Sequence, residues 1–155
     1  PDLVRISTGP MTQPELIGWA LASELCLFPS KFEMDTFLMA MGEAMAAGAA
    51  PIATAQQGMR HFGHRFDLDD PQAAGLALPR SFRVNDPVLT EALADGLRRM
   101  LRLMRSDPAR FQALRARAVA VARQFSWRQT ADRFADIFTA AAKLADADAR
   151  RGTDA

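Results

Sequence analysis

The chain is poor in the residue types that build disulfide frameworks and metal centres. It has one cysteine and two histidines among its 155 residues. A single cysteine cannot form a disulfide within the chain, which fits a reducing compartment such as the cytoplasm. His61 and His64, without a second cysteine or a third histidine, fall short of the ligand sets of zinc sites. We therefore expect a cytoplasmic protein without a bound metal.

Other absences narrow the class of protein further. No apolar run reaches eighteen residues, so no membrane-spanning helix is expected. The glycine patterns of dinucleotide-binding and phosphate-binding loops are missing, and no Ser-His-Asp or Cys-His set stands out. What remains is a globular composition, with 49% hydrophobic and 24% charged residues, that can form a core. The chain begins at Pro1 without methionine, so we expect it to be a portion of a longer protein.

The charges are distributed unevenly along the chain. Residues 1–77 carry four basic and nine acidic groups, net −5, whereas residues 78–155 carry fifteen and nine, net +6. A basic half is compatible with nucleic-acid binding. However, Arg98, Arg99, Arg102 and Arg105 lie on or beside one face of a predicted helix, and no aromatic residues interleave with them. We interpret this face as solvent-exposed and expect no nucleic-acid partner.

The most informative stretch has the pattern of a strand, a helix and a second strand. Apolar runs at 26–28 and 51–55 are bounded by turn residues and predict two strands. Between them, a helix is predicted over 37–47, with Asp35 or Thr36 as its cap. Because this helix is apolar on almost every side, we expect it to be buried all round. A short strand-helix-strand unit makes the two strands parallel.

Polar side chains follow the carboxyl ends of both predicted strands, where open α/β sheets bind ligands. They are Ser30, Lys31, Glu33 and Asp35 after the first, and Thr54, Gln56 and Gln57 after the second. Glu43 is the single charge in the apolar helix, and no Lys or Arg lies three or four residues away. A carboxylate there either faces a polar ligand or points out of an exposed helix end, and its surroundings favour the ligand.

The remaining pattern predicts an α/β fold with a doubly wound parallel sheet closed by helices. Thr12 can cap a helix whose core face holds Leu16 and Trp19, and a short strand is expected at 76–78. Three consecutive helices follow, starting at Asp86, at Asp107 and after Ser126, the last ending near Ala147. We therefore divide the chain into an α/β lobe over 1–85, packed helices over 86–148 and a frayed tail over 149–155.

Several ordered blocks of this sequence match the pattern of a known family. They are Phe28-Pro29-Ser30, Phe32-Glu33, Glu43 to Gly48 (EAMAAG), Pro51-Ile52-Ala53-Thr54 and, near the other end, Phe125-Ser126-Trp127. Together they resemble the donor-sugar region of retaining glycosyltransferases of the two-lobed GT-B fold, especially glycogen and starch synthases. The resemblance runs from about Val4 to Ala142. It implies a partial Rossmann-like, C-terminal, donor-binding lobe, with the N-terminal acceptor lobe missing from the sequence.

The resemblance also implies roles for individual residues. The first acid of the motif, Glu33 or Asp35, would hold hydroxyls of the donor sugar. Backbone amides at a helix start would face the diphosphate, Glu43 would bind the ribose, and the turn after the second strand would also touch the donor. The amides are those of Thr36, Phe37 and Leu38, and the turn residues are Gln57 and Gly58. Trp127 would anchor the last helix.

The spacing of the two acids departs from the family pattern. The family places seven residues between them, as between Asp35 and Glu43, whereas nine lie between Glu33 and Glu43. The Phe32-Glu33 context favours Glu33, so both residues stay candidates. The resemblance implies glucosyl transfer from an ADP- or UDP-sugar to a glucan-like acceptor, with no cofactor besides that substrate. The alternatives are a noncatalytic GT-B-like lobe and a sugar-nucleotide epimerase lobe.

Overall fold

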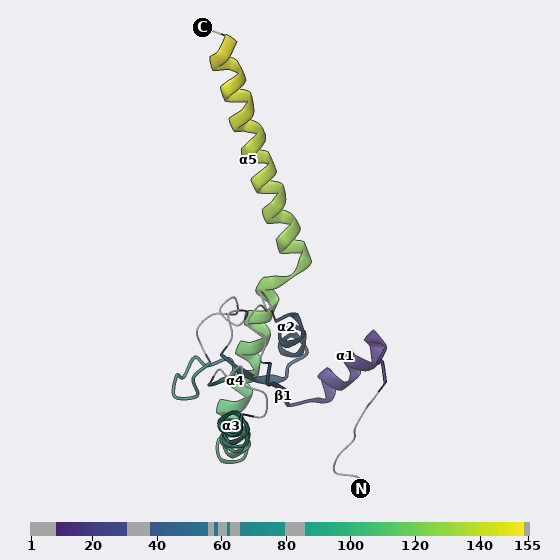
Figure 1. Cartoon of the computed structure of the whole chain (residues 1–155), viewed down its shortest axis with the longest axis vertical. Helices are drawn as coiled ribbons and strands as arrows, with labels where there is room; N and C mark the ends of the chain where they lie inside the picture. Colours follow the sequence, from purple (N-terminus) through teal and green to yellow (C-terminus); the bar gives the residue numbers. More distant parts are fainter. Residues whose placement is uncertain are drawn as a thin grey trace. The chain divides into compact units, whose positions relative to one another are not determined.

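The computed structural model describes residues 9–30, 38–55, 66–79 and 86–153, together with Gly58 and Phe62. The chain divides into two compact units, residues 1–122 and 123–155, which are described separately. The first two of the three predicted helices pack on the sheet and belong to the first unit. The first unit holds the sheet (Figure 1).

In the part of the chain that the structure describes, the sheet has three parallel strands in the order β1 (Leu25–Phe28), β2 (Ala50–Thr54) and β3 (Leu76–Leu78). In the register, Leu25 pairs with Ala50 and Ile52 pairs with Leu76. Every residue of β2 is buried because a strand pairs on each side and helices cover both faces. The predicted strands and their parallel direction are therefore confirmed.

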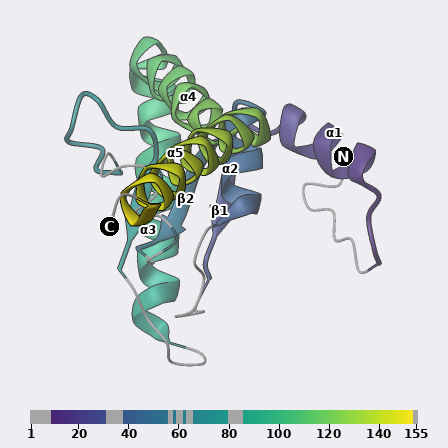
Figure 2. The same cartoon turned by 90° about the horizontal axis from the view of Figure 1, so that it is seen from above.

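Helices α2 (Met39–Ala46) and α3 (Pro87–Ser106) flank the sheet on opposite faces (Figures 1 and 2). Side chains alternate along a strand, so Ala53 joins the cluster under α2 while Ile52 joins the cluster under α3. Helix α4 (Pro108–Ala122) contributes to both clusters. Its first half supplies Phe111 and Leu114 to the α3 side, and its second half supplies Ala118 and Ala122 to the α2 side.

Helix α4 also closes the amino-terminal edge of the sheet through three arginines. The Nε of Arg115 donates to the carbonyl of Gly48, just before β2, at 2.6 Å, and Nη1 lies 3.9 Å from Glu24. The Nε of Arg117 donates to the carbonyl of Ala73, ahead of β3, at 2.8 Å. Arg110 donates to the carbonyl of Leu68. These guanidinium groups satisfy loop carbonyls on that side and leave the opposite, carboxyl edge to other segments.

The structure corrects the prediction for α2. The helix begins at Met39 with Leu38 in the N-cap position, two residues later than predicted, so neither Asp35 nor Thr36 occupies that position. Only one face is buried, through Met41, Ala44 and Met45. The expectation of burial all round is wrong. The buried face packs on β2 and α4, whereas the opposite face, which includes Met39 and Glu43, is exposed.

Helix α1 (Gln13–Ala22) begins where its cap predicts but lacks the expected core face. Both the backbone N–H and the hydroxyl of Thr12 donate to Glu15 Oε2 at 2.8 Å, and these bonds lower the pKa of Glu15. Leu16 and Trp19 are each 47% exposed, and no residue of α1 is buried. An apolar spacing alone does not supply the partner that would cover it, so this prediction is wrong for the described chain.

The second unit consists of a short 3₁₀ turn (Arg123–Phe125) and α5 (Trp127–Thr153). The predicted cap is confirmed, since the N–H of Gln129 donates to Ser126 Oγ at 3.2 Å. The helix continues past the predicted end near Ala147 to Thr153. Trp127, at the start of this helix, is 81% exposed. None of the helices in the described segments has the length and apolarity needed to cross a membrane.

Candidate functional site

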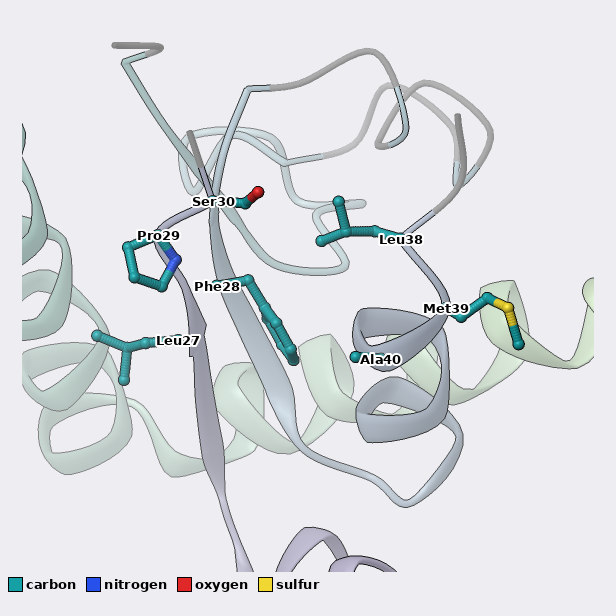
Figure 3. Close-up of a pocket in the computed structure, with 7 residues that line it drawn as sticks. All are labelled: Leu27, Phe28, Pro29, Ser30, Leu38, Met39 and Ala40. Atoms are coloured by element: carbon teal, nitrogen blue, oxygen red, sulfur yellow. The ribbon is translucent and has the colours of Figure 1, made fainter. Parts of the chain in front are cut away.

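A pocket of about 470 Å³ opens at the carboxyl edge of the sheet, between the end of β1 and the start of α2 (Figure 3). Its walls are the last residues of β1 with the turn after it, and the first residues of α2. They are Leu27, Phe28, Pro29, Ser30, Leu38, Met39 and Ala40. Ser30 is the one polar side chain in this described lining. The edge is the one at which open α/β sheets hold ligands.

The amino-terminal end of α2 gives this pocket a site for negative charge. The first bond of the helix runs from the N–H of Gly42 to the carbonyl of Leu38 at 3.1 Å. The N–H groups of Met39, Ala40 and Met41 precede it and have no acceptor inside the helix. Unpaired helical N–H groups and the positive end of the helix dipole favour an anion. A phosphate-bearing ligand therefore fits this end of the pocket.

Close packing against Phe62 holds α2 in place. Phe62 is buried, and a Cβ added to Gly42 would lie 3.1 Å from two atoms of its ring. The glycine lets the ring approach the helix backbone. On the sheet side, Phe28 packs against the same cluster and points toward Ala40 in Figure 3. The wall formed by α2 is thus fixed from two directions.

A buried threonine joins the two strands at this edge. The hydroxyl of Thr54, the last residue of β2, donates to the carbonyl of Ser30 at 2.6 Å, and the carbonyl of Phe28 lies 3.5 Å away. Thr54 is only 1% exposed. A buried hydroxyl without an acceptor is costly, so this bond fixes the position of Ser30. The contact spans 24 residues of sequence and ties the pocket wall to the central strand.

Five of the predicted site residues lie outside the described part of the chain: Glu33, Asp35, Thr36, Phe37 and Gln57. Of the other three, Leu38 lines the pocket and is 9% exposed. Gly58 is buried in a 3₁₀ turn. Only Leu38 is thus placed directly at the pocket, at the N-cap of α2.

Glu43 lies on the exposed face of α2, one turn after Met39 and Ala40 of the pocket wall. Residues three and four apart share a helix face, and each helical Cβ tilts toward the amino-terminal end. Glu43 therefore shares the exposed face of α2 with two residues of the pocket wall. Because Glu43 is exposed, the argument that a buried carboxylate demands a ligand no longer applies to it. Its location beside the pocket remains the support for a ligand role.

The thiol of Cys26 is the next titratable group of the sheet. It is half-buried in β1. Burial raises the pKa of the Cys26 thiol, and a hydrogen bond with Ser23 opposes this shift to a smaller extent. The thiolate is the reactive form, so a raised pKa lowers the reactive fraction at neutral pH.

Sequence reasoning missed the apolar part of the pocket and the role of Thr54. Leu27, Met39 and Ala40 looked like ordinary core residues because hydrophobic periodicity does not separate a core from a pocket wall. Thr54 had a visible signal, since it is a polar residue that ends an otherwise apolar strand. Its partner could not be found, because a carbonyl 24 residues away has no signature in sequence.

Comparison with known proteins identifies the relatives of this chain. It is 33% identical over 140 residues to a D-inositol 3-phosphate glycosyltransferase from Thermobispora bispora, covering 90% of this chain and 28% of the relative. It is 31% identical over 153 residues to a protein of the same name from Kineococcus radiotolerans, covering 99% of this chain and 32% of the relative. The chain thus spans about 30% of the length of these relatives. No family model matches it.

This chain is also similar in fold to a solved structure. Sucrose-phosphate synthase from Thermosynechococcus elongatus superposes with a TM-score of 0.61 at 26% sequence identity. The match covers 86% of this chain and 30% of that enzyme. The similarity therefore extends to most of this chain but to less than a third of that enzyme.

Proposed function

Because the homologues of this chain are glycosyltransferases and its fold is that of part of a GT-B C-terminal lobe, we propose that it binds the nucleotide-sugar donor of a retaining hexosyltransferase. The observation that carries this proposal is the pocket between the end of β1 and the start of α2. The helix terminus offers N–H groups and a positive dipole to the diphosphate, which is the leaving group. Stabilising that charge favours cleavage of the sugar–phosphate bond.

The predicted residues would take complementary roles in donor binding. The amides of Thr36, Phe37 and Leu38 precede α2 and would bind the diphosphate, as would the turn of Gln57 and Gly58. Glu33 or Asp35 would accept hydrogen bonds from the sugar hydroxyls. Glu43 would accept hydrogen bonds from the two ribose hydroxyls, since each carboxylate oxygen can take one donor. Leu38 occupies the N-cap of α2, so capping of this helix does not account for Asp35, and both acids stay candidates.

The acceptor is the part of the proposal with two candidates. The resemblance to glycogen and starch synthases favours a glucan. The names of the relatives, which act on D-inositol 3-phosphate or make sucrose phosphate, favour a small phosphorylated polyol or sugar. In either case a second lobe of the whole enzyme would bind the acceptor, and the donor would be ADP- or UDP-linked glucose. We propose that the enzyme acts in the cytoplasm.

The first test measures transfer by the full-length protein. UDP-glucose or ADP-glucose is incubated with a glucan, with inositol phosphate or with a sugar phosphate. The release of UDP or ADP and the formation of the glycoside product are followed. Acceptor-dependent release with retained anomeric configuration is expected. Conversion of the nucleotide sugar without an acceptor would instead identify an epimerase, and the absence of both binding and turnover would identify a noncatalytic lobe.

A second test asks whether the pocket is the binding site. Ala40 lines the pocket and is exposed, so Ala40→Phe fills the pocket without entering the core. The matched control is Ala46→Phe, since Ala46 is exposed on the same helix and does not line the pocket. We expect the first variant to weaken UDP-glucose or ADP-glucose binding by about tenfold or more and the second to leave it within about twofold. Equal binding by both variants would place the donor elsewhere.

A further inference from the structure

Thr54 stands out from the other buried residues of the described chain. It is the one polar side chain among those that form the core, and it lies at the carboxyl end of β2. Its hydroxyl donates to the carbonyl of Ser30 at 2.6 Å. Nothing in the assignment of donor-binding residues uses this bond.

The bond acts beyond the end of the β1–β2 ladder. The paired register ends at Phe28 opposite Ala53, so backbone pairing does not extend to Pro29 and Ser30. Both of these residues line the pocket. The Thr54 hydroxyl supplies the tie that the ladder no longer provides, and it does so from the central, fully buried strand. Thr54 therefore ties this wall of the pocket to the central strand.

We infer that Thr54 is a positioning residue for donor binding, acting through Ser30 on the pocket wall. The inference rests on the proposed function. Ser30 is also joined directly to the segment 31–37, which carries both candidate sugar-binding acids. A displacement of about 1 Å in a binding group can lower a rate by as much as a hundredfold. Loss of this hydrogen bond should therefore lower the use of the donor more than it lowers the stability of the fold.

The experiment compares three substitutions at Thr54 in the full-length enzyme. Thr54→Ser and Thr54→Ala both lack the methyl group, so a difference between them is due to the hydroxyl alone. Thr54→Val keeps the shape and removes the hydroxyl. Ile52→Val is the matched control, because Ile52 is buried in the same strand and faces the opposite cluster. Urea midpoints, steady-state kinetics with varied UDP-glucose or ADP-glucose, and amide exchange over residues 28–40 are measured for each.

We expect the Ala and Val variants to lose about tenfold or more in kcat/KM for the donor, with the acceptor KM unchanged and faster exchange at 28–40. The Ser and Ile52→Val variants should stay within about threefold of the wild type. Equal losses in the Ser and Ala variants would overturn the role of the hydroxyl, as would a Val variant that behaves like Ile52→Val. A wild-type enzyme that uses no nucleotide sugar would instead overturn the proposed function itself.

Discussion

Replacing Gly75 with alanine should destabilise the first unit by about 2–3 kcal/mol, the upper part of the range for overpacking. Gly75 lies just ahead of β3, against the central strand. An added Cβ would lie 2.8 Å from the carbonyl oxygen of Pro51, 2.7 Å from its Cγ and 2.9 Å from Cδ1 of Phe66. The Phe66 ring can rotate away, but the Pro51 carbonyl belongs to β2, which pairs on both sides. The clash therefore has to move backbone.

Urea unfolding of the protein that carries this chain measures the effect. With a slope of about 2 kcal/mol per molar, the midpoint of Gly75→Ala should fall by about 1 M. Gly18→Ala is the control, because Gly18 lies in α1 with nothing within 4 Å of its added Cβ. Its midpoint should stay or rise, since alanine favours a helix by up to about 1 kcal/mol. A Gly75→Ala midpoint equal to that of the wild type would refute the packing argument.

Three further predictions concern single groups. Glu43→Ala should lower kcat/KM for the donor in steady-state kinetics by roughly 5- to 150-fold, or about 1–3 kcal/mol. The control Glu91→Ala, at an exposed residue, should not lower it. A Glu43→Ala variant with the same kcat/KM as the wild type would remove Glu43 from the site. Arg115→Met should cost about 1.5–3 kcal/mol in urea unfolding by taking the charged donor from the Gly48 carbonyl, unlike Arg98→Met. Burial raises the pKa of Cys26, so the unfolded thiol ionises first, and stability should fall as pH rises from about 8.5 toward the higher folded value. Cys26→Ala should flatten this decline in pH-dependent unfolding.

The elements that follow local rules could be predicted from the sequence. The three strands, the parallel pairing and the starts of the long helices at Asp86 and Asp107 depend on turn residues, caps and apolar runs that lie next to one another in the chain. Asp86 shows this directly, since its Oδ1 accepts from the N–H of Val88 at 3.0 Å. Such signals need no knowledge of the tertiary structure.

Burial and partners could not be predicted in the same way. Leu16 of α1 and Met39 of α2 have the apolar character of core residues, yet they are 47% and 54% exposed. Whether an apolar face is covered depends on which segment reaches it, and this is a long-range property. The carboxyl edge of the sheet follows from the parallel topology, whereas the Thr54–Ser30 bond could not be predicted because it depends on how two strands distant in sequence pair.

The arginines of α4 have a consequence for how the chain folds during synthesis. Arg115 and Arg117 satisfy carbonyls that lie 67 and 44 residues earlier in the sequence. A nascent chain that ends before Pro108 contains all three strands but lacks these donors and the side chains that α4 adds to both clusters. Since buried carbonyls without donors oppose folding, the segments made before α4 should remain accessible to proteases and chaperones until α4 has been synthesised. The first unit would then reach its native state only after α4, its last helix, has been synthesised.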